Sequence, residues 1–339
     1  KHDVIAFLTH LAEIVGSELV VRSGGREVAR LASAASNDVT AWAALSFTAV
    51  ETARHASPQL AAASAEDLYE AYFDAAMRQL DSYSRYLSAA ESENEVASRD
   101  GYGGVGLVIE AREDEGTIVV RDVFARGPAA QAGLRAGGPL EAVDGVPTRG
   151  LTLSEVARRL RGPVDTDVTI RFLRDGRSDT RTMVRERVIQ NVVSRSLEGD
   201  VLVLRISRFN SATVRFVNDA IRDTETALGR PASGIVLDLR GNPGGLLDQS
   251  VGVADLFIAS GDIVSTRGRH PQSLQRYRAG RSEVWPEVPI VVLVDDRTAS
   301  GAEVLAAALQ DSGRAVVAGS SSFGKGSVQT VTTLPNSGE

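Results

Sequence analysis

The chain has 339 residues, enough for about two or three domains, and its 43% hydrophobic and 24% charged residues are ordinary for a globular protein. The net charge of -7 and the pI of about 5.3 exclude a broad electrostatic attraction to nucleic acid or to an anionic membrane. The absence of cysteine excludes disulfides and thiolate metal sites, and the four histidines lack metal-ligand spacing; they are His2, His10, His55 and His270.

The first part of the chain, residues 1–97, is predicted to be a helical region. It is rich in Ala, Glu, Leu and Ser, and no glycine stands between Gly25 and Gly101. Leu68 and Ala71 begin an apolar stripe at helical spacing, which is typical of a helix that packs one face on a core. We expect this N-terminal helical region to serve in packing or self-association, or to bind an adaptor.

A β-rich module is predicted in residues 98–187. From Gly101 the sequence breaks into short strands separated by Gly and Pro, beginning with GYGGVGLVIEA and GTIVVRDVF. One amphipathic helix, LTLSEVARRLRG, begins at a Thr152 cap, and the strands DVTIRFLRDG and TRTMVRERV follow it. This texture predicts a small separate domain.

Residues 188–339 alternate apolar strands with amphipathic helices. The expected strands are VLVLRISRF, GIVLDLR, VPIVVLVD and RAVVAG. One helix ends at Gly229, a second is entered through the turn GNPGG, and a third is ASGAEVLAAALQDSG. The alternation predicts an α/β domain with a largely parallel sheet, covered by helices on both faces, whose sites gather at the carboxyl ends of the strands. The fold class expected for the whole chain is therefore multidomain α+β.

Lys325 is one of only two lysines among the 37 lysines and arginines of the chain. It lies in GSSSFGKG, which is close to the GxxxxGK[ST] loop that binds nucleotide phosphates. That loop should continue with Ser or Thr and then a helix. Here Gly326 follows, and the next residues, SVQTVTTL, have the β-branched alternation of a strand. A phosphate-binding loop is therefore disfavoured.

A lysine, unlike an arginine, can lose its proton and act as a base. Apolar neighbours such as Phe323 and Val328 would favour the neutral form of Lys325 by desolvation. The serine that such a base could activate is Ser300, which follows a buried strand and begins an Ala-rich helix, where the positive field of the helix N-terminus favours an alkoxide. The alternative for Ser300 is an ordinary N-cap. A Ser-His-Asp triad would need His270 from a polar loop or a histidine of the helical region, so a Ser-Lys pair fits the chain better.

With these residues in place, three segments in order resemble the carboxy-terminal processing proteases, also called tail-specific proteases. The segments are IVLDLRGNPGGLLDQSVGVADLFI (235–258), VVLVDDRTASGAEVLAAALQD (291–311) and GSSSFGKGSVQTV (319–331). The β-rich module resembles the PDZ domain of this family through GYGGVGLVI and GPAAQAGLRAGGPLEAVDG. The resemblance covers about residues 66–339, and none is found for the first 65.

The resemblance implies a serine endopeptidase of Ser-Lys type, with Ser300 as the nucleophile and Lys325 as the general base. Gln329 would hydrogen-bond and orient the lysine, since four residues along a strand return to the same face. The alternative for Gln329 is an exposed strand glutamine. The implied oxyanion hole consists of backbone N–H groups, one from Gly301 and one from Gly244 or Gly245.

The resemblance also implies that the PDZ domain binds the C-terminal tails of substrates. Its loop would present N–H groups to the terminal carboxylate while an exposed strand edge pairs with the tail. Turn glycines without a ligand are the alternative. The expected partners are proteins or peptides with unstructured C-terminal tails, and nucleic acid is not expected. The loop residues are Gly103, Gly104, Val105 and Gly106.

The chain is thus expected to be an endopeptidase that cuts upstream of such tails and needs no metal or organic cofactor. Two rivals are an inactive scaffold whose PDZ domain gathers protein tails, and a nucleotide-binding protein that uses GSSSFGKG. The resemblance implies a bacterial cell-envelope location, periplasmic or exported, with a targeting segment upstream of the given residues. The final PNSGE resembles a hairpin turn that lacks its return strand, so the protease domain is expected to continue past Glu339.

Overall fold

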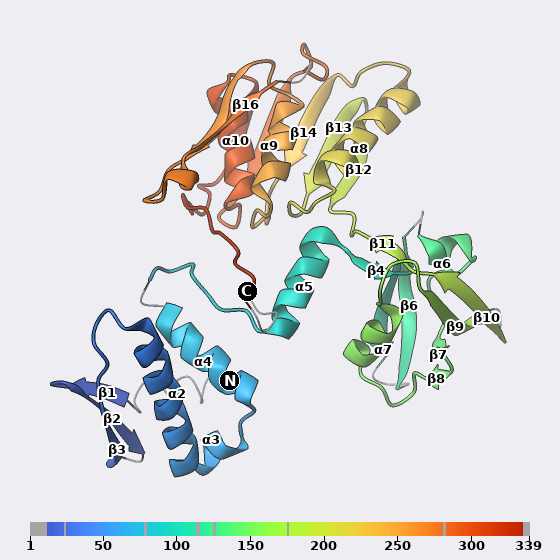
Figure 1. Ribbon diagram of the computed structural model, residues 1–339. Helices are drawn as coiled ribbons and strands as arrows, with labels where there is room; N and C mark the ends of the chain where they lie inside the picture. The colour runs from blue at the N-terminus through green and yellow to red at the C-terminus, as the bar shows by residue number, and fades with distance from the viewer. Residues whose placement is uncertain are drawn as a thin grey trace. The chain divides into compact units, whose positions relative to one another are not determined.

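The computed structural model describes residues 12–23, 25–77, 80–112, 116–124, 127–174, 176–280 and 283–334 (Figure 1). These residues fall into two compact units, one within residues 1–94 and 329–339 and one within residues 95–328. Helix α5 (Ala89–Asp100) crosses from the first unit to the second. No helix of the described residues is long and apolar enough to cross a lipid bilayer.

The first unit is helical only in part, which corrects the expectation of a region helical throughout. An antiparallel sheet in the order β1-β2-β3 precedes its helices. Val20 and Val21 are completely buried, and β3 turns Ala29 and Leu31 toward the helices. The helical prediction rested on the composition of all 97 residues, which does not reveal the short alternation of apolar and polar residues that indicates a strand. The strands are β1 (Ala12–Val15), β2 (Glu18–Ser23) and β3 (Arg26–Ala32).

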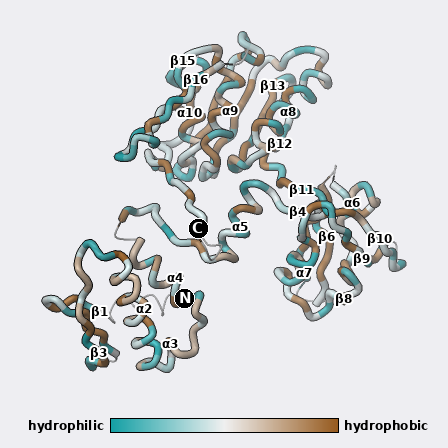
Figure 2. The backbone as a smooth tube through the Cα atoms, in the orientation of Figure 1, coloured by the Kyte–Doolittle hydropathy of each residue, from teal (hydrophilic) through white to brown (hydrophobic). Residues whose placement is uncertain are grey.

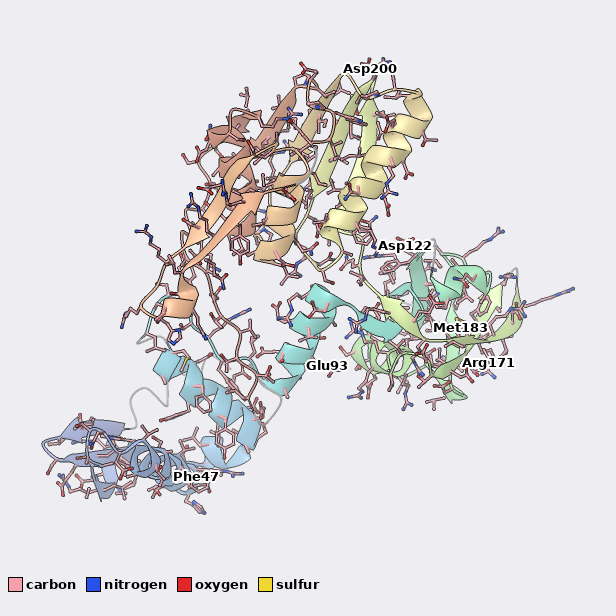
Figure 3. All side chains as sticks on the ribbon, turned by 45° about the horizontal axis from the view of Figure 1, so that its top comes forward. Phe47, Glu93, Asp122, Arg171, Met183 and Asp200 are labelled. Carbon is pink, nitrogen blue, oxygen red and sulfur yellow. The ribbon has the colours of Figure 1, made fainter. Side chains whose placement is uncertain are left out.

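The helices of the first unit cover this sheet with a small apolar core. Leu68 and Ala71 are buried, as the helical stripe predicted, and Leu60 and Ala53 pack in the same core. Phe47, labelled in Figure 3, is 56% exposed on its helix. The helices are α2 (Val39–Ala56), α3 (Pro58–Ala62) and α4 (Ala65–Met77).

The β-rich module contains three small sheets, in the orders β4-β11, β5-β6 and β10-β9-β7-β8. Helix α7 begins at Thr152, whose hydroxyl accepts the N–H of Glu155 while the Glu155 carboxylate accepts the N–H of Thr152, as the capping prediction required. Met183, labelled in Figure 3, packs with Val156 in the module's core. The elements are β4 (Tyr102–Gly104), β5 (Leu107–Arg112), β6 (Thr117–Val123), α6 (Pro128–Gln131), β7 (Leu140–Val143), β8 (Val146–Pro147), α7 (Leu153–Leu160), β9 (Asp167–Arg174), β10 (Arg177–Val184) and β11 (Glu186–Val188).

The α/β part is built on a five-stranded sheet in the order β12-β13-β14-β17-β18. Strand β12 is antiparallel to β13, and the other neighbours are parallel, so the prediction of a largely parallel sheet is confirmed. Asp200 (Figure 3) lies in the turn between β12 and β13. The hydrophobic residues of this part lie mainly in its strands and helices (Figure 2). The strands are β12 (Val193–Glu198), β13 (Val201–Ile206), β14 (Gly234–Asp238), β17 (Ile290–Val294) and β18 (Ala315–Gly319).

The three long helices of the α/β part lie side by side: α8 contacts α9, and α9 contacts α10 (Figure 1). The four parallel strands follow one another across the sheet in chain order, and right-handed crossovers then place every connecting helix on the same face. The expectation of helices on both faces was therefore wrong. The burial of β17 supports an arrangement with helices on one face only. The side chains of Ile290, Val292 and Val294, on one face of the strand, are buried, while Val291 and Leu293, on the other face, are only half-buried. The remaining elements are α8 (Thr213–Leu228), α9 (Leu247–Asp255), α10 (Gly301–Asp311), the hairpin β15 (Gly261–Thr266) and β16 (Gln275–Ala279), and the 3-10 turn η1 (Pro271–Ser273).

Candidate active site

Ser300 lies between the carboxyl end of β17 and the first residue of α10, where its position in the sequence predicted it. Its backbone has φ 54° and ψ −119°, a region that a non-glycine residue rarely occupies. Such a conformation costs about 1–3 kcal/mol and persists only where the surroundings hold it. Thr298, completely buried two residues earlier, donates its hydroxyl to the carbonyl of Leu239 (3.0 Å) and so anchors the segment to β14's end.

The end of β14 carries a second anchored turn. Asp238 is buried and accepts two hydrogen bonds from the guanidinium of Arg240, both at 2.8 Å, which lower the pKa of Asp238. Asp295, the residue after β17, accepts the N–H of Gly241 (2.8 Å), and this bond lowers the pKa of Asp295. The two neighbouring strand ends are therefore joined by a carboxylate that stays ionised near neutral pH.

Gly244 lies against the serine. A Cβ at position 244 would come within 2.7 Å of the Cβ of Ser300 and 2.8 Å of the nitrogen of Gly301, closer than real side chains approach. Its φ of 98° is also in the region that favours glycine. Residue 244 therefore has to be glycine for the GNPGG turn to lie beside Ser300.

The three glycines expected at the oxyanion hole differ in how their N–H groups are used. Gly244 donates its N–H to Oδ1 of Asn242 (2.8 Å). Gly245 is exposed and Gly301 begins α10, and the backbone hydrogen bonds within the described part of the chain include none from either N–H. Of the two alternatives left open by the sequence, Gly245 is thus the one whose N–H is not already bonded.

The lysine segment follows β18 and returns to the serine segment. Ser320 donates its N–H to the carbonyl of Val294 (3.3 Å), and Phe323 donates its N–H to the carbonyl of Thr298 (2.9 Å). Lys325 is half-buried, two residues further along. The order of the sheet explains the return, because β17 and β18 are parallel neighbours whose carboxyl ends meet at one edge.

Glu303, a residue that the sequence reasoning missed, joins the serine and lysine segments through one carboxylate. Oε2 accepts the N–H groups of Ser300 (2.7 Å) and Lys325 (3.1 Å). Oε1 accepts the N–H of Gly324 (2.6 Å) and the hydroxyl of Ser322 (2.7 Å). Partial burial raises the pKa of Glu303, but the four donors outweigh it, and the pKa lies below its ordinary value. The spacing Ser300-x-x-Glu303 is that of a capping box, a signal that could have identified the residue.

Gln329 does not lie on a strand with Lys325. Residues 320–334 form no helix or strand, so the strand predicted for SVQTVTTL was wrong. A strand needs a ladder partner, and β18 is already the edge of the sheet among the described residues. Gln329 belongs to the other compact unit, where its amide donates to the carbonyl of Tyr83.

The loop Gly103–Gly106 consists of the end of β4, where Gly103 and Gly104 pair with β11, and of the connection to β5, which is Val105 and Gly106. The carbonyl of Gly103 accepts the N–H of Gly162 (3.0 Å), and that of Val105 accepts the N–H of Ala129 (2.9 Å). A Cβ at Gly103 would lie 2.0 Å from the carbonyl oxygen of Gly162, and Gly106 has φ 76°, so both positions require glycine. Strand β5 leaves this loop and, among the described residues, pairs only with β6, so its other edge is unpaired.

Arg185 holds the end of α7 next to this loop, because it contacts Gly162, whose N–H is bonded to the carbonyl of Gly103. It is 7% exposed and donates hydrogen bonds to the carbonyls of Arg159 (2.9 Å) and Leu160 (3.2 Å) at the end of α7. A cation is favourable at a helix C-terminus, because the last carbonyl groups carry partial negative charge. Its guanidinium also packs on Gly162, where a Cβ would come within 2.9 Å. The described residues contain no group of three or more His, Cys, Asp or Glu side chains that could hold a metal ion.

Comparisons with known proteins agree with this architecture. Residues 200–339 match the family model "Peptidase family S41", and residues 119–174 match "PDZ domain". A carboxy-terminal-processing protease of Bartonella bacilliformis is 38% identical over 278 residues, 80% of this chain and 63% of that protein. A carboxyl-terminal-processing protease of Synechocystis is 34% identical over 260 residues, 74% of this chain and 60% of that protein.

Among solved structures, the photosystem II D1 C-terminal processing protease is 30% identical to this chain. The match covers 81% of this chain and 75% of that one, with a TM-score of 0.43. The chain spans less than two thirds of the length of the two curated relatives. The α/β part therefore belongs to peptidase family S41 and the β-rich module is a PDZ domain, in a chain that is similar to carboxy-terminal processing proteases.

Proposed function

We propose that this protein is a serine endopeptidase that binds the C-terminal tails of protein substrates through its PDZ domain and cleaves upstream of them by a Ser-Lys mechanism. The observation that carries the proposal is the Glu303 carboxylate, which holds the N–H of Ser300 and the N–H of Lys325 at one point. A serine in a strained backbone conformation and a lysine 25 residues later are thereby kept in adjacent segments. Strain of this kind clusters at active sites.

In the proposed first step, Oγ of Ser300 attacks the carbonyl carbon of the scissile bond as the neutral amine of Lys325 takes the hydroxyl proton. The carbonyl oxygen becomes an oxyanion, which accepts hydrogen bonds from the N–H groups of Gly301 and Gly245. Lys325 then gives its proton to the leaving amine as the C–N bond breaks, which leaves an acyl-enzyme. A water molecule attacks the ester carbonyl, Lys325 again takes and returns a proton, and Ser300 is released.

Glu303 would act in this mechanism through backbone N–H groups and the hydroxyl of Ser322, and not through the side chain of Ser300. Its carboxylate remains ionised in the pH range where a lysine can lose its proton, because its pKa is lowered. It would therefore hold the two segments together without competing for the serine proton. Gln329 is proposed to orient Lys325 through a hydrogen bond.

Tail recognition is assigned to the loop Gly103–Gly106 and to the unpaired edge of β5. Because Gly103 and Gly104 pair with β11, the N–H groups proposed to receive the carboxylate are those of Val105 and Gly106, between β4 and β5. An extended tail can add to the free edge of β5 as a further strand. We further propose that the N-terminal unit serves in self-association or adaptor binding, and that the protein works in the bacterial cell envelope, either in the periplasm or after export.

The test is cleavage of an unfolded protein with an apolar C-terminus by the full-length wild type, Ser300→Ala and Lys325→Arg. Both variants should lose cleavage, because alanine has no nucleophile and arginine keeps the charge but cannot act as a base. Near wild-type turnover by Lys325→Arg would contradict the assignment of the base. If the wild type bound tails but cleaved no faster than Ser300→Ala, the protein would be a tail-binding scaffold instead.

A further inference from the structure

We propose that Asn242 is a positioning residue that decides which backbone N–H groups are left to bind the oxyanion. The inference rests on the proposed function, since it concerns the same site. Asn242 is completely buried in the GNPGG turn. Its Nδ2 donates to the carbonyl of Ile206 (2.9 Å), the last residue of β13, and its Oδ1 accepts the N–H of Gly244 (2.8 Å).

The main chain of Asn242 is engaged as well. Its carbonyl accepts the N–H of Ala299 (2.9 Å), the residue before Ser300, and its N–H donates to the carbonyl of Leu239 (3.0 Å). One residue therefore joins the ends of β13 and β14 to the segment that enters α10. A displacement of the Asn242 side chain would be transmitted to both the glycine turn and the serine.

The bond to Gly244 has a chemical consequence. Gly244, which is buried against Ser300, donates its N–H to Oδ1 of Asn242. The next residue, Gly245, is exposed, and its N–H does not bond to Asn242. Gly244 becomes a spacer whose Cα sets the separation between the turn and Ser300, while Gly245 and Gly301 supply the donors. Without the Asn242 side chain, Gly244 would turn its N–H toward other acceptors and change the position of Gly245.

The two hydrogen bonds require an amide of this length. Aspartate offers acceptors but no donor for the carbonyl of Ile206, leucine offers neither, and serine is too short to reach both partners. Buried polar groups that lose a partner are costly, so the turn has a reason to keep this residue.

Asn210 provides a matched control for a merely structural role. It is also completely buried, it donates Nδ2 to the carbonyl of Gln190 (2.8 Å), and its Oδ1 accepts the N–H of Ala212 (3.2 Å). Its Oδ1 also accepts the hydroxyl of Thr213 (3.2 Å), so Asn210→Ala removes the same side-chain volume as Asn242→Ala and one side-chain hydrogen bond more. None of these bonds reaches residues 241–245 or 298–301.

The experiment measures kcat, KM and inhibition by a peptide aldehyde in the full-length protein carrying Asn242→Ala, Asn242→Ser or Asn210→Ala. The aldehyde forms a hemiacetal with the serine, so its affinity reports on the oxyanion hole. We expect Asn242→Ala to lower kcat by about 10²-fold with KM within about twofold, because small misplacement of a catalytic group has effects of this size. The inhibition constant of the aldehyde should rise by the same factor. For Asn242→Ser, both kcat and the inhibition constant should lie between the values for Asn242→Ala and for the wild type.

Asn210→Ala should keep kcat and aldehyde affinity within about threefold, although its thermal unfolding temperature falls as that of Asn242→Ala does. The inference would be overturned if Asn242→Ala and Asn210→Ala changed kcat and aldehyde affinity alike. It would also be wrong if neither Asn242 variant folded while Asn210→Ala did, since Asn242 would then be a folding residue. Ser300→Ala separates this outcome from failure of the proposed function: an active Ser300→Ala refutes the serine mechanism itself, whatever the Asn242 variants do.

Discussion

The carboxylate of Glu303 accepts the N–H of Ser300 at 2.7 Å, within the first turn of α10. The same oxygen also accepts the N–H of Lys325, so a local helix cap becomes a contact between two distant segments. The cap satisfies a backbone donor that every helix start leaves open. At this helix it also determines where the lysine segment lies.

Replacing Glu303 by glutamine should separate these two segments. Each carboxylate oxygen accepts two donors, so whichever way the amide turns, its NH2 group faces two N–H or O–H groups. We expect Glu303→Gln to destabilise the fold by about 1–3 kcal/mol. Cleavage should fall by at least about tenfold, because the lysine segment moves relative to Ser300. Thermal unfolding measures the loss of stability, and kcat on a peptide substrate measures the loss of cleavage.

Glu155→Gln is the matched control for that substitution. Glu155 also closes a capping box, but a single oxygen, Oε2, accepts both the N–H and the hydroxyl of Thr152. An amide oxygen can take over that role, so this variant should cleave at close to the wild-type rate. Equal activity of Glu303→Gln and Glu155→Gln would show that Glu303 does nothing beyond capping its helix.

The pair Asp238–Arg240 should make stability depend on acid pH. The hydrogen bonds from Arg240 lower the pKa of Asp238, so its contribution is fully present above the unfolded pKa of about 4 and is lost as pH falls through the folded value. Asp238→Asn should therefore cost about 1–2 kcal/mol at pH 7 and much less at pH 3. Urea unfolding of both proteins at the two pH values is the measurement. A stability difference that does not shrink at pH 3 would rule out ionisation of Asp238 as its cause.

Gly244→Ala should abolish cleavage through a collision with the nucleophile. The new Cβ would lie 2.7 Å from the Cβ of Ser300, and both cannot keep their places. We expect a loss of kcat of at least about 10²-fold. Gly261→Ala is the control, since Gly261 also has a positive φ, 107°, but an added Cβ there meets nothing within 4 Å. Both variants should lose stability from backbone strain, about 1–2 kcal/mol for each, and only Gly244→Ala should lose cleavage. Retention of cleavage by Gly244→Ala would place the nucleophile elsewhere.

Gly103→Ala should weaken the capture of tails by the PDZ domain. A Cβ 2.0 Å from the carbonyl oxygen of Gly162 must displace the loop, whereas one at Gly145, in the turn before β8, meets nothing within 4 Å. The wild type and Gly145→Ala should cleave a substrate with a free terminal carboxylate faster than its amidated form. Gly103→Ala should cleave the two forms at the same low rate. If the wild type already treated both forms equally, the loop would not bind the carboxylate.

The sequence predicted the strands of the α/β part well because β13, β14, β17 and β18 are short apolar runs. Three of them, β13, β14 and β17, are largely buried, whereas β18 lies at the edge of the sheet and is mostly exposed. The helix end at Gly229 was also readable, because the residue has φ 69° in a C-cap that favours glycine. Strands β1, β2 and β3, within residues 12–32, were mispredicted because averaged composition conceals short strands in an exposed, partly polar sheet.

For the site, the sequence by itself determined the residue types: a serine at a helix start, a lysine where arginine is otherwise used, and glycines at the turns between them. These choices follow from local backbone geometry and from what each side chain can do chemically. Only the tertiary structure decided that Glu303 and Asn242 join those segments, and that the N–H of Gly244 is already bonded while that of Gly245 is not. Hydrogen bonds between the ends of neighbouring parallel strands depend on the order of strands in the sheet, and that order has no signature in the local sequence.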